Sequence, residues 1–173
     1  MATTYFSWAF PATAARLIGD YSCLEDVGCV LEDVPQANLL MSASRNGWLL
    51  ATLVSVFTEL GLSRLKVLKQ TYSSFSVREL PEVLQEIESV LSFARDCPES
   101  IADVMQHDYD AESVSLGLQA SVEAAVPHLG PSRGEEGDDP EYLFSWLKSL
   151  RMLVLQASES GLCLVHVQPR WQA

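Results

Sequence analysis

The stretch PEYLFSWLKSLRMLVLQASESGLCLVHVQ, residues 140–168, decides the fold class of this chain. Large apolar side chains recur in it every three or four positions, which is the spacing of one helix face. Asp139 suits the capping position, Pro140 the first helical position, and Gly161 the end of this helix. After the glycine, the apolar run LCLVHVQ (162–168) predicts a strand. The repeating apolar residues are Leu143, Trp146, Leu147, Leu150, Leu153 and Val154.

A second strand is expected at the other end of the chain. Residues 3–8 (TTYFSW) are rich in β-forming side chains. The segments between the two strands favour helices, which we expect at 11–19, 46–60, 76–95 and 110–125, with Gly61 as the C-terminal cap of the second. The terminal strands are expected to pair in one sheet, with helices covering one face. The chain is therefore predicted to be a single α+β domain over residues 1–173, predominantly helical with a small sheet formed by strands near both termini.

Four shorter segments are less regular. Residues 27–31 could form another strand, and residues 101–105 a short turn of helix. Apolar residues at every third position of 62–69 favour a helix over a strand. The tract PHLGPSRGEEGDD (127–139) combines proline, glycine and acidic residues, which disfavour packed structure. It is predicted to be a mobile acidic loop.

The helix expected over residues 76–95 carries two start signals. Ser76 and Glu79 fit a capping box, in which each side chain accepts the other residue's backbone N–H. Pro81 suits the first turn, where its missing N–H costs little. The predicted buried face consists of Leu80, Val83, Leu84, Ile87, Val90 and Leu91.

The charge of the chain is strongly acidic and uneven. Asp and Glu number 23 and Lys and Arg number 11, so the net charge is −12. Residues 79–139 carry fifteen acids and two bases, whereas residues 61–78 carry four bases and no acid. This field disfavours nucleic acids and anionic membranes and favours a basic partner. The simpler alternative is that the acidity only serves solubility.

A reducing cytoplasm is the expected compartment. The four cysteines, at 23, 29, 97 and 163, form no CxxC pair and have no histidine at zinc-finger spacing. The first residues lack the basic and long apolar regions of a signal peptide. No stretch approaches the 18 apolar residues of a membrane span. Cys163, inside an apolar run, is interpreted as a buried small hydrophobe.

The sequence contains no short motif for nucleotide, metalloprotease or hydrolase chemistry. We therefore predict neither catalytic residues nor a cofactor or metal. His107 lies among acids, including Asp108, and could act as a general base or metal ligand. A solvated loop histidine is the preferred interpretation. His166 in the terminal strand is interpreted as a core or edge histidine, and His128 as a loop residue.

Paired carboxylates occur on the helix expected over residues 76–95. Glu82 and Glu86 are four residues apart and face the same side, whereas Glu88 does not face Glu86. Such a pair could bind a divalent cation or divide acid and base roles. A solvated helix face is the preferred interpretation.

Three segments together carry a resemblance to a known family. They are GWLLATLVSVFTELGL (47–62), YSSFSVRELPEVLQEIESV (72–90) and YLFSWLKSLRMLVLQASESGLCLVHV (142–167). Their order and pattern resemble small immunity proteins encoded beside bacterial polymorphic and type VI secretion toxins, and among these the immunity protein 70 type. The likeness covers roughly residues 46–168.

The resemblance implies a cytoplasmic immunity protein used in bacterial competition. Such a protein binds a cognate secreted toxin and occludes its active site. If the toxin is a nuclease with a basic cleft, acids of residues 79–139 are suited to block it. The predicted partner-binding residues are Glu99, Asp103, Asp108, Asp110, Glu112, Glu135, Glu136, Asp138 and Asp139.

Two other function classes remain open. An acidic secretion chaperone that carries an effector to its apparatus would also be small and α+β, and is often dimeric. This chain could likewise form a homodimer. The other alternative is an enzyme that uses His107 with Asp108 and Asp110.

Overall fold

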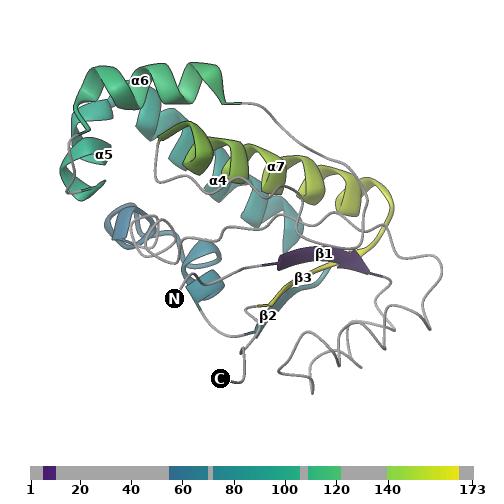
Figure 1. The fold of residues 1–173 in the computed structure, drawn as a ribbon. Helices are drawn as coiled ribbons and strands as arrows, with labels where there is room; N and C mark the ends of the chain where they lie inside the picture. The colour runs from purple at the N-terminus through teal and green to yellow at the C-terminus, as the bar shows by residue number, and fades with distance from the viewer. Residues whose placement is uncertain (1–5, 11–54, 70–71, 106–108, 122–139, 168–173) are drawn as a thin grey trace, which may run out of the picture.

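The computed structural model describes residues 6–10, 55–69, 72–105, 109–121 and 140–167 (Figure 1). In this part of the chain, helices dominate and three strands form one sheet. The prediction of a predominantly helical α+β fold with a small sheet is confirmed. The strands are β1 (Phe6–Phe10), β2 (Tyr72–Phe75) and β3 (Cys163–Val167); the helices are the 3-10 helix η1 (Leu65–Lys69), α4 (Leu80–Asp96), α5 (Pro98–Met105), α6 (Ala111–Ala120) and α7 (Pro140–Glu159).

The sheet has the strand order β1-β3-β2, and both pairings are antiparallel. Phe6 lies opposite Val167 on one side of β3, and Phe75 lies opposite Leu164 on the other. The strands near the two termini therefore pair, as predicted. The strand expected at residues 3–8 is found at Phe6–Phe10, and residues 3–5 lie outside the described residues.

The edge strand β2 was not predicted. It is only four residues long, and two of these are serines, which are weak strand formers. The helix expected at residues 62–69 is shorter, because it is limited to the 3-10 turns of η1 after a bend at Ser63 and Arg64. The strand β2 pairs with β3 along one edge of the sheet and contacts η1.

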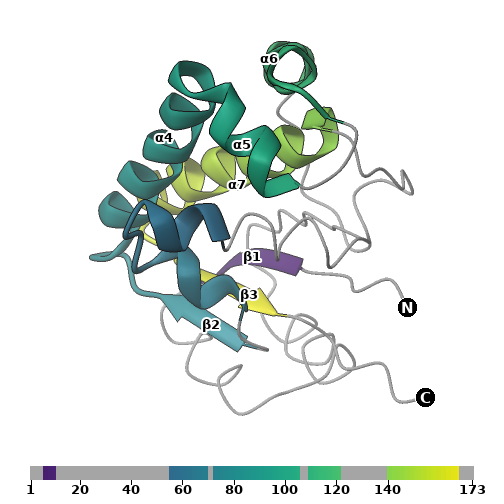
Figure 2. The ribbon, with the colours of Figure 1, turned by 90° about the vertical axis from the view of Figure 1, so that its left-hand side faces the viewer.

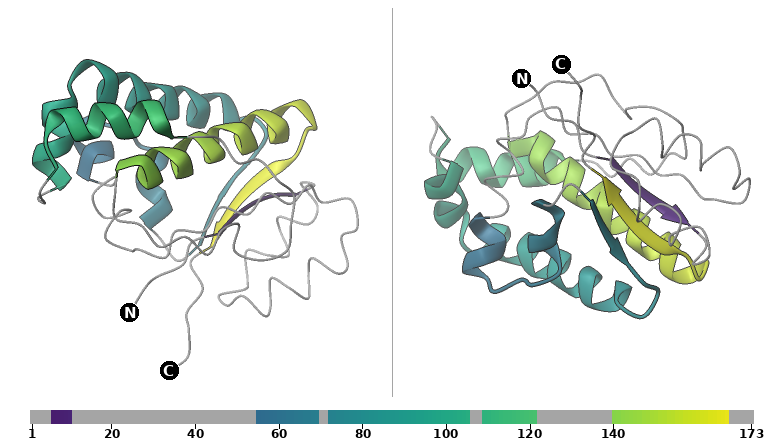
Figure 3. Two further views of the ribbon diagram at one scale, coloured as in Figure 1. Left: turned by 45° about the horizontal axis from the view of Figure 1, so that its top comes forward. Right: turned by 90° about the horizontal axis from the view of Figure 1, so that it is seen from below.

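The helices form a layer over one face of the sheet (Figure 3). α4 and α7 pack against each other, and α7 also contacts β1 and β3. Burial of their apolar faces is the main stabilising contribution to such a layer. The largest fully buried side chains of the core are Phe57, Leu65, Leu68, Leu80, Ile87, Ile101 and Phe144.

The start of α4 differs from the predicted capping box. Residues 77–79 form a turn, and the helix begins at Leu80. The Glu79 carboxylate accepts the backbone N–H and the hydroxyl of Ser76, at 2.9 and 2.8 Å. The backbone N–H of Glu79 bonds the Ser76 carbonyl at 2.9 Å and not the Ser76 hydroxyl, so the serine side chain does not cap the helix. Only half of the predicted box is present.

The predicted helix ends are confirmed where they are described. Gly61 follows the helical residues 55–59 with φ of 69°, and Gly161 follows α7 with φ of 66°. Glycine adopts this left-handed conformation without a steric cost. The predicted helix at 11–19, the strand at 27–31 and the loop at 127–139 lie outside the described residues.

α6 packs closely on the first turn of α7. A Cβ atom built on Gly117 would lie 2.6 Å from Cβ of Pro140 and 2.8 Å from the backbone nitrogen of Glu141. Two turns further along α7 than these contacts, Lys148 donates from Nζ to the carbonyls of Leu118 and Ser121, at 2.9 and 3.0 Å. These carbonyls lie at the C-terminal end of α6, so the ammonium group satisfies acceptors that a helix end leaves unpaired.

Candidate functional site

Four of the predicted partner-binding acids lie on two consecutive helices, α5 and α6. Glu99 and Asp103 belong to α5, Asp110 is the residue before α6, and Glu112 is in the first turn of α6. All four are exposed. Figure 2 looks onto the end of the helical layer where α5 and α6 lie, with α5 facing the viewer and α6 furthest from the sheet. The structure therefore brings these four acids to one end of the molecule.

The outward orientation of the α5 acids follows from helix periodicity. Glu99 and Asp103 are four residues apart and share one face. Ile101, which lies on another face of the same helix, is almost completely buried. Since α5 also packs against α6, the apolar face is used for folding and the acidic face is left to solvent.

Asp110 has a second role, because it caps α6. Its Oδ1 atom accepts the backbone N–H and the hydroxyl of Ser113, both at 2.8 Å. The backbone N–H bond, followed by the hydroxyl bond, lowers the pKa of the Asp110 carboxyl below its ordinary value. Asp110 is therefore ionised at neutral pH, and its carboxylate is partly occupied by its own helix.

The remaining predicted partner-binding residues lie outside the described residues. These are Asp108, Glu135, Glu136, Asp138 and Asp139. The sequence between Asp96 and Arg133 contains no Lys or Arg. Consequently, neither α5 nor α6 supplies a cation that could neutralise the acidic end.

Glu82 and Glu88 of α4 are exposed, as expected of a solvated helix face, but Glu86 and Glu88 also contact neighbouring elements. The Glu86 carboxylate accepts the backbone N–H groups of Arg64 and Leu65, with shortest distances of 2.9 and 2.8 Å. It thereby caps the start of η1 from a helix that is distant in sequence. Glu88 pairs with Arg151 of α7. These acids connect α4 to its neighbours.

Arg64 joins the same cluster through its side chain. Its guanidinium bonds Glu79 at 2.7 Å and Glu82 at 2.8 Å. This cluster was not predicted from the sequence, although the charge distribution contains a signal for it. The most basic segment, residues 61–78, directly precedes the first glutamates of the acidic segment. Opposite charges on adjacent segments favour pairing.

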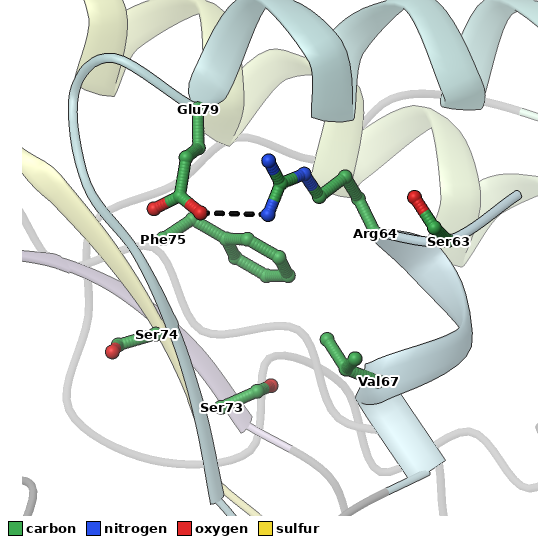
Figure 4. Close-up of a pocket in the computed structure, with 7 residues that line it drawn as sticks. All are labelled: Ser63, Arg64, Val67, Ser73, Ser74, Phe75 and Glu79. Carbon is green, nitrogen blue, oxygen red and sulfur yellow. Dashed lines mark hydrogen bonds and ion pairs between the residues drawn. The ribbon is translucent and has the colours of Figure 1, made fainter.

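A pocket of about 380 Å³ lies between η1 and β2, beside the pair of Arg64 and Glu79 (Figure 4). Its walls are formed by Ser63, Arg64, Val67, Ser73, Ser74, Phe75 and Glu79. Ser73 is 6% exposed, and its Oγ atom has no hydrogen-bond partner among the described residues. The pocket thus combines hydroxyl groups with an ion pair that is already formed.

The chemistry that this pocket can support is limited. Activation of a serine requires a base within hydrogen-bond distance, and the walls contain no histidine or cysteine. Glu79 is the only carboxylate, and the hydrogen bonds from the backbone and side chain of Ser76 lower its pKa. A carboxylate with a lowered pKa is a weak base. These lining residues form no nucleophile–base pair.

His166 and Cys163, both in β3, belong to the core. Burial lowers the pKa of His166 to about 4, against the effect of a hydrogen bond with the backbone of Leu68. Burial raises the pKa of the Cys163 thiol. Cys163 was predicted to be buried, and of the two positions predicted for His166, core or edge, the structure shows a buried one. His107 and His128 lie outside the described residues. In the part of the chain that the structure describes, no group of three His, Cys, Asp or Glu side chains could hold a metal ion.

Two further findings bear on function. Among the helices in the described ranges, none is both long enough and apolar enough to cross a bilayer. Comparison with models of protein families, with curated proteins and with solved structures finds no match to this chain. The resemblance to the immunity protein 70 type therefore stays a prediction.

Proposed function

We propose that this chain is a cytoplasmic immunity protein that binds a cognate secreted toxin and blocks its active site stoichiometrically. The observation that carries the proposal is the acidic end of the molecule, formed by Glu99, Asp103, Asp110 and Glu112. The acidic end is complementary in charge to a partner with a basic surface, such as the cleft of a nuclease. In such a complex the carboxylates take the places of the substrate phosphates.

The distribution of ion pairs supports α5 and α6 as the binding surface. On α4, Glu86 caps η1 and Glu88 pairs with Arg151. Binding through those acids would first require that the internal contacts be broken. By contrast, Glu99, Asp103 and Glu112 have no ion pair among the described residues. A partner can therefore bind these charges without breaking an ion pair among the described residues.

Exposed charges act mainly through long-range attraction. A protein of net charge −12 attracts a basic partner from a distance and speeds the encounter. This attraction is screened by salt, with a Debye length of about 8 Å at physiological ionic strength. We therefore expect the association rate to fall steeply as salt is added, while the dissociation rate changes less.

The first experiment is co-purification of the tagged full chain from its native host, followed by mass spectrometry of the bound protein. We expect a toxin domain in stoichiometric amount, and growth of cells that express the toxin only when this chain is also expressed. An effector that is delivered onward, with restored secretion instead of protection, would favour a secretion chaperone. If purification yields no partner, the immunity proposal loses its basis.

The surface is then tested by charge reversal. The triple variant Glu99→Lys, Asp103→Lys, Glu112→Lys should weaken binding by roughly 10- to 100-fold, since each rim pair contributes about 0.5–1 kcal/mol. A control of equal charge change compares the double variant Glu99→Lys, Asp103→Lys with the double variant Glu59→Lys, Glu159→Lys, which alters exposed acids outside α5 and α6. Equal weakening by both variants would show that net charge, and not this surface, governs binding.

A further inference from the structure

A second pocket lies in the groove between α4, α6 and α7. Its volume is about 310 Å³. Grooves between packed helices are a common place for ligand sites. The lining residues are Leu91 and Arg95 of α4, Ser115, Leu118 and Gln119 of α6, and Lys148 of α7.

The apolar part of this groove comes from two leucines. Leu91 is buried and belongs to the core, and Leu118 is partly buried and packs against the core. An apolar group placed on them would be removed from water, at a gain of about 25 cal/mol for each Å² of apolar surface. The groove can therefore hold the apolar body of a small ligand.

Two cations line the same groove. Arg95 is exposed in the last turn of α4, and no carboxylate pairs with it among the described residues. Lys148 donates to two carbonyls at the end of α6, those of Leu118 and Ser121. An ammonium group has three N–H donors, so one remains.

These two cations differ from the arginines described above. Arg64 and Arg151 are both held by glutamates of the surrounding helices. At the groove, a guanidinium and an ammonium group lie beside apolar surface, and none of the described lining residues is a carboxylate. A ligand that complements the groove would therefore carry a negative charge.

We propose that this groove binds a monocarboxylate with an apolar body. The apolar body lies on Leu91 and Leu118, and the carboxylate accepts hydrogen bonds from Arg95 and Lys148. Charge-assisted bonds of this kind are stronger than neutral ones, and an arginine can hold a carboxylate through two of them. This site goes beyond the proposed immunity function and does not depend on it.

The chemistry of the groove discriminates between ligand classes. A cationic ligand would be repelled by Arg95 and Lys148, and a neutral one would leave both charges without a counter-ion. A polyanion would be repelled by the net charge of −12. Two kinds of ligand combine one carboxylate with an apolar body. One is a free aliphatic acid, and the other is the terminal carboxylate of a peptide that ends in an apolar residue.

The test titrates the full chain with octanoate, octanol and octylamine by calorimetry and by NMR amide shifts. We expect saturable 1:1 binding of octanoate, with amide shifts on α4, α6 and α7, and much weaker binding of the other two probes. Arg95→Gln should weaken octanoate binding by about 10-fold, which corresponds to 1.4 kcal/mol. The control Arg78→Gln, at an exposed arginine outside the groove, should bind octanoate like the unmodified chain.

A second arm separates the two kinds of ligand. It compares acetyl-Gly-Gly-Leu as the free acid with the same peptide as its amide. Preference for the free acid over octanoate assigns the site to a chain terminus, and the reverse preference assigns it to a small acid; both support the proposal. Equal binding of octanoate and octanol, or unchanged octanoate binding by Arg95→Gln, would overturn it.

Discussion

Gly117 of α6 lies against Pro140 at the first residue of α7, so closely that a Cβ atom on the glycine would be 2.6 Å from Cβ of the proline. Real Cβ atoms do not approach other atoms this closely. The absence of a side chain at Gly117 therefore sets the distance between the two helices.

Gly117→Ala should destabilise the protein, although alanine is the better helix former. The gain in helix propensity is about 1 kcal/mol, whereas forcing a methyl group into a packed contact typically costs about 1–3 kcal/mol. The neighbours include the backbone of Pro140 and Glu141, which cannot rotate away. Chemical denaturation measures the difference, with the exposed Gln119→Ala of the same helix as control. A more stable Gly117→Ala variant would show that α6 can move.

Glu86→Ala should cost more than Glu88→Ala, although both remove a glutamate from α4. Loss of Glu86 leaves the backbone N–H groups of Arg64 and Leu65 without their acceptor, at a cost of about 1–3 kcal/mol. Loss of Glu88 removes a partly exposed ion pair with Arg151, which contributes less than about 1 kcal/mol. Urea denaturation of the two variants provides the comparison. Equal losses would mean that water replaces the carboxylate at η1 without cost.

The free energy of unfolding should fall in mild acid because of the buried His166. Its pKa is lowered from 6.5 to about 4 by burial, so the unfolded chain binds a proton at a higher pH than the folded one. Its contribution is fully present above about pH 6.5 and is lost as the pH falls toward 4. The loss amounts to roughly 3 kcal/mol.

The measurement is the free energy of unfolding between pH 7 and pH 4 for the unmodified chain and for His166→Gln. The variant keeps all carboxyl groups, including Glu79 and Asp110, whose lowered pKa values add losses at still lower pH. The difference between the two pH profiles isolates His166. Parallel profiles would indicate that the buried imidazole is protonated in the folded state or accessible to water.

Two substitutions of Asp110 separate its role as the cap of α6 from the role of its negative charge in binding. Asp110→Ala removes the acceptor of the Ser113 N–H and should lower Tm by roughly 2–4 °C. Asp110→Ser keeps an oxygen at the capping position and should preserve most of that Tm. If a basic partner binds at this end, both variants should weaken binding alike. A serine variant that restores binding as well as stability would assign Asp110 to folding alone.

The sequence predicted those features that depend on local pattern. The apolar repeat of α7, the glycines at 61 and 161 and the β-branched run of β3 each specify an element through neighbouring residues. The pairing of β1 with β3 followed from having one strand near each end. The order of the strands did not follow, because β2 carries little strand signal of its own and is held by η1 and by the edge of β3.

The candidate site was predicted only as a set of acids. Sequence position does not show whether a glutamate faces solvent or accepts the N–H groups of a distant turn. Glu86 and Glu99 look alike in the sequence, yet Glu86 bonds two backbone N–H groups and Glu99 is exposed. The distinction depends on which segment packs beside each helix, and that contact is made over long range.

The central place of β3 has a consequence for synthesis of the protein. β1 and β2 both pair with β3, and neither pairs with the other. While the ribosome is still adding residues before Cys163, the two earlier strands have no partner within the sheet. Assembly of the sheet must therefore wait until the last described strand has left the exit tunnel. Pairings this distant in sequence are slow to form. During that interval the nascent chain presents unpaired strand edges, the feature through which incomplete chains aggregate.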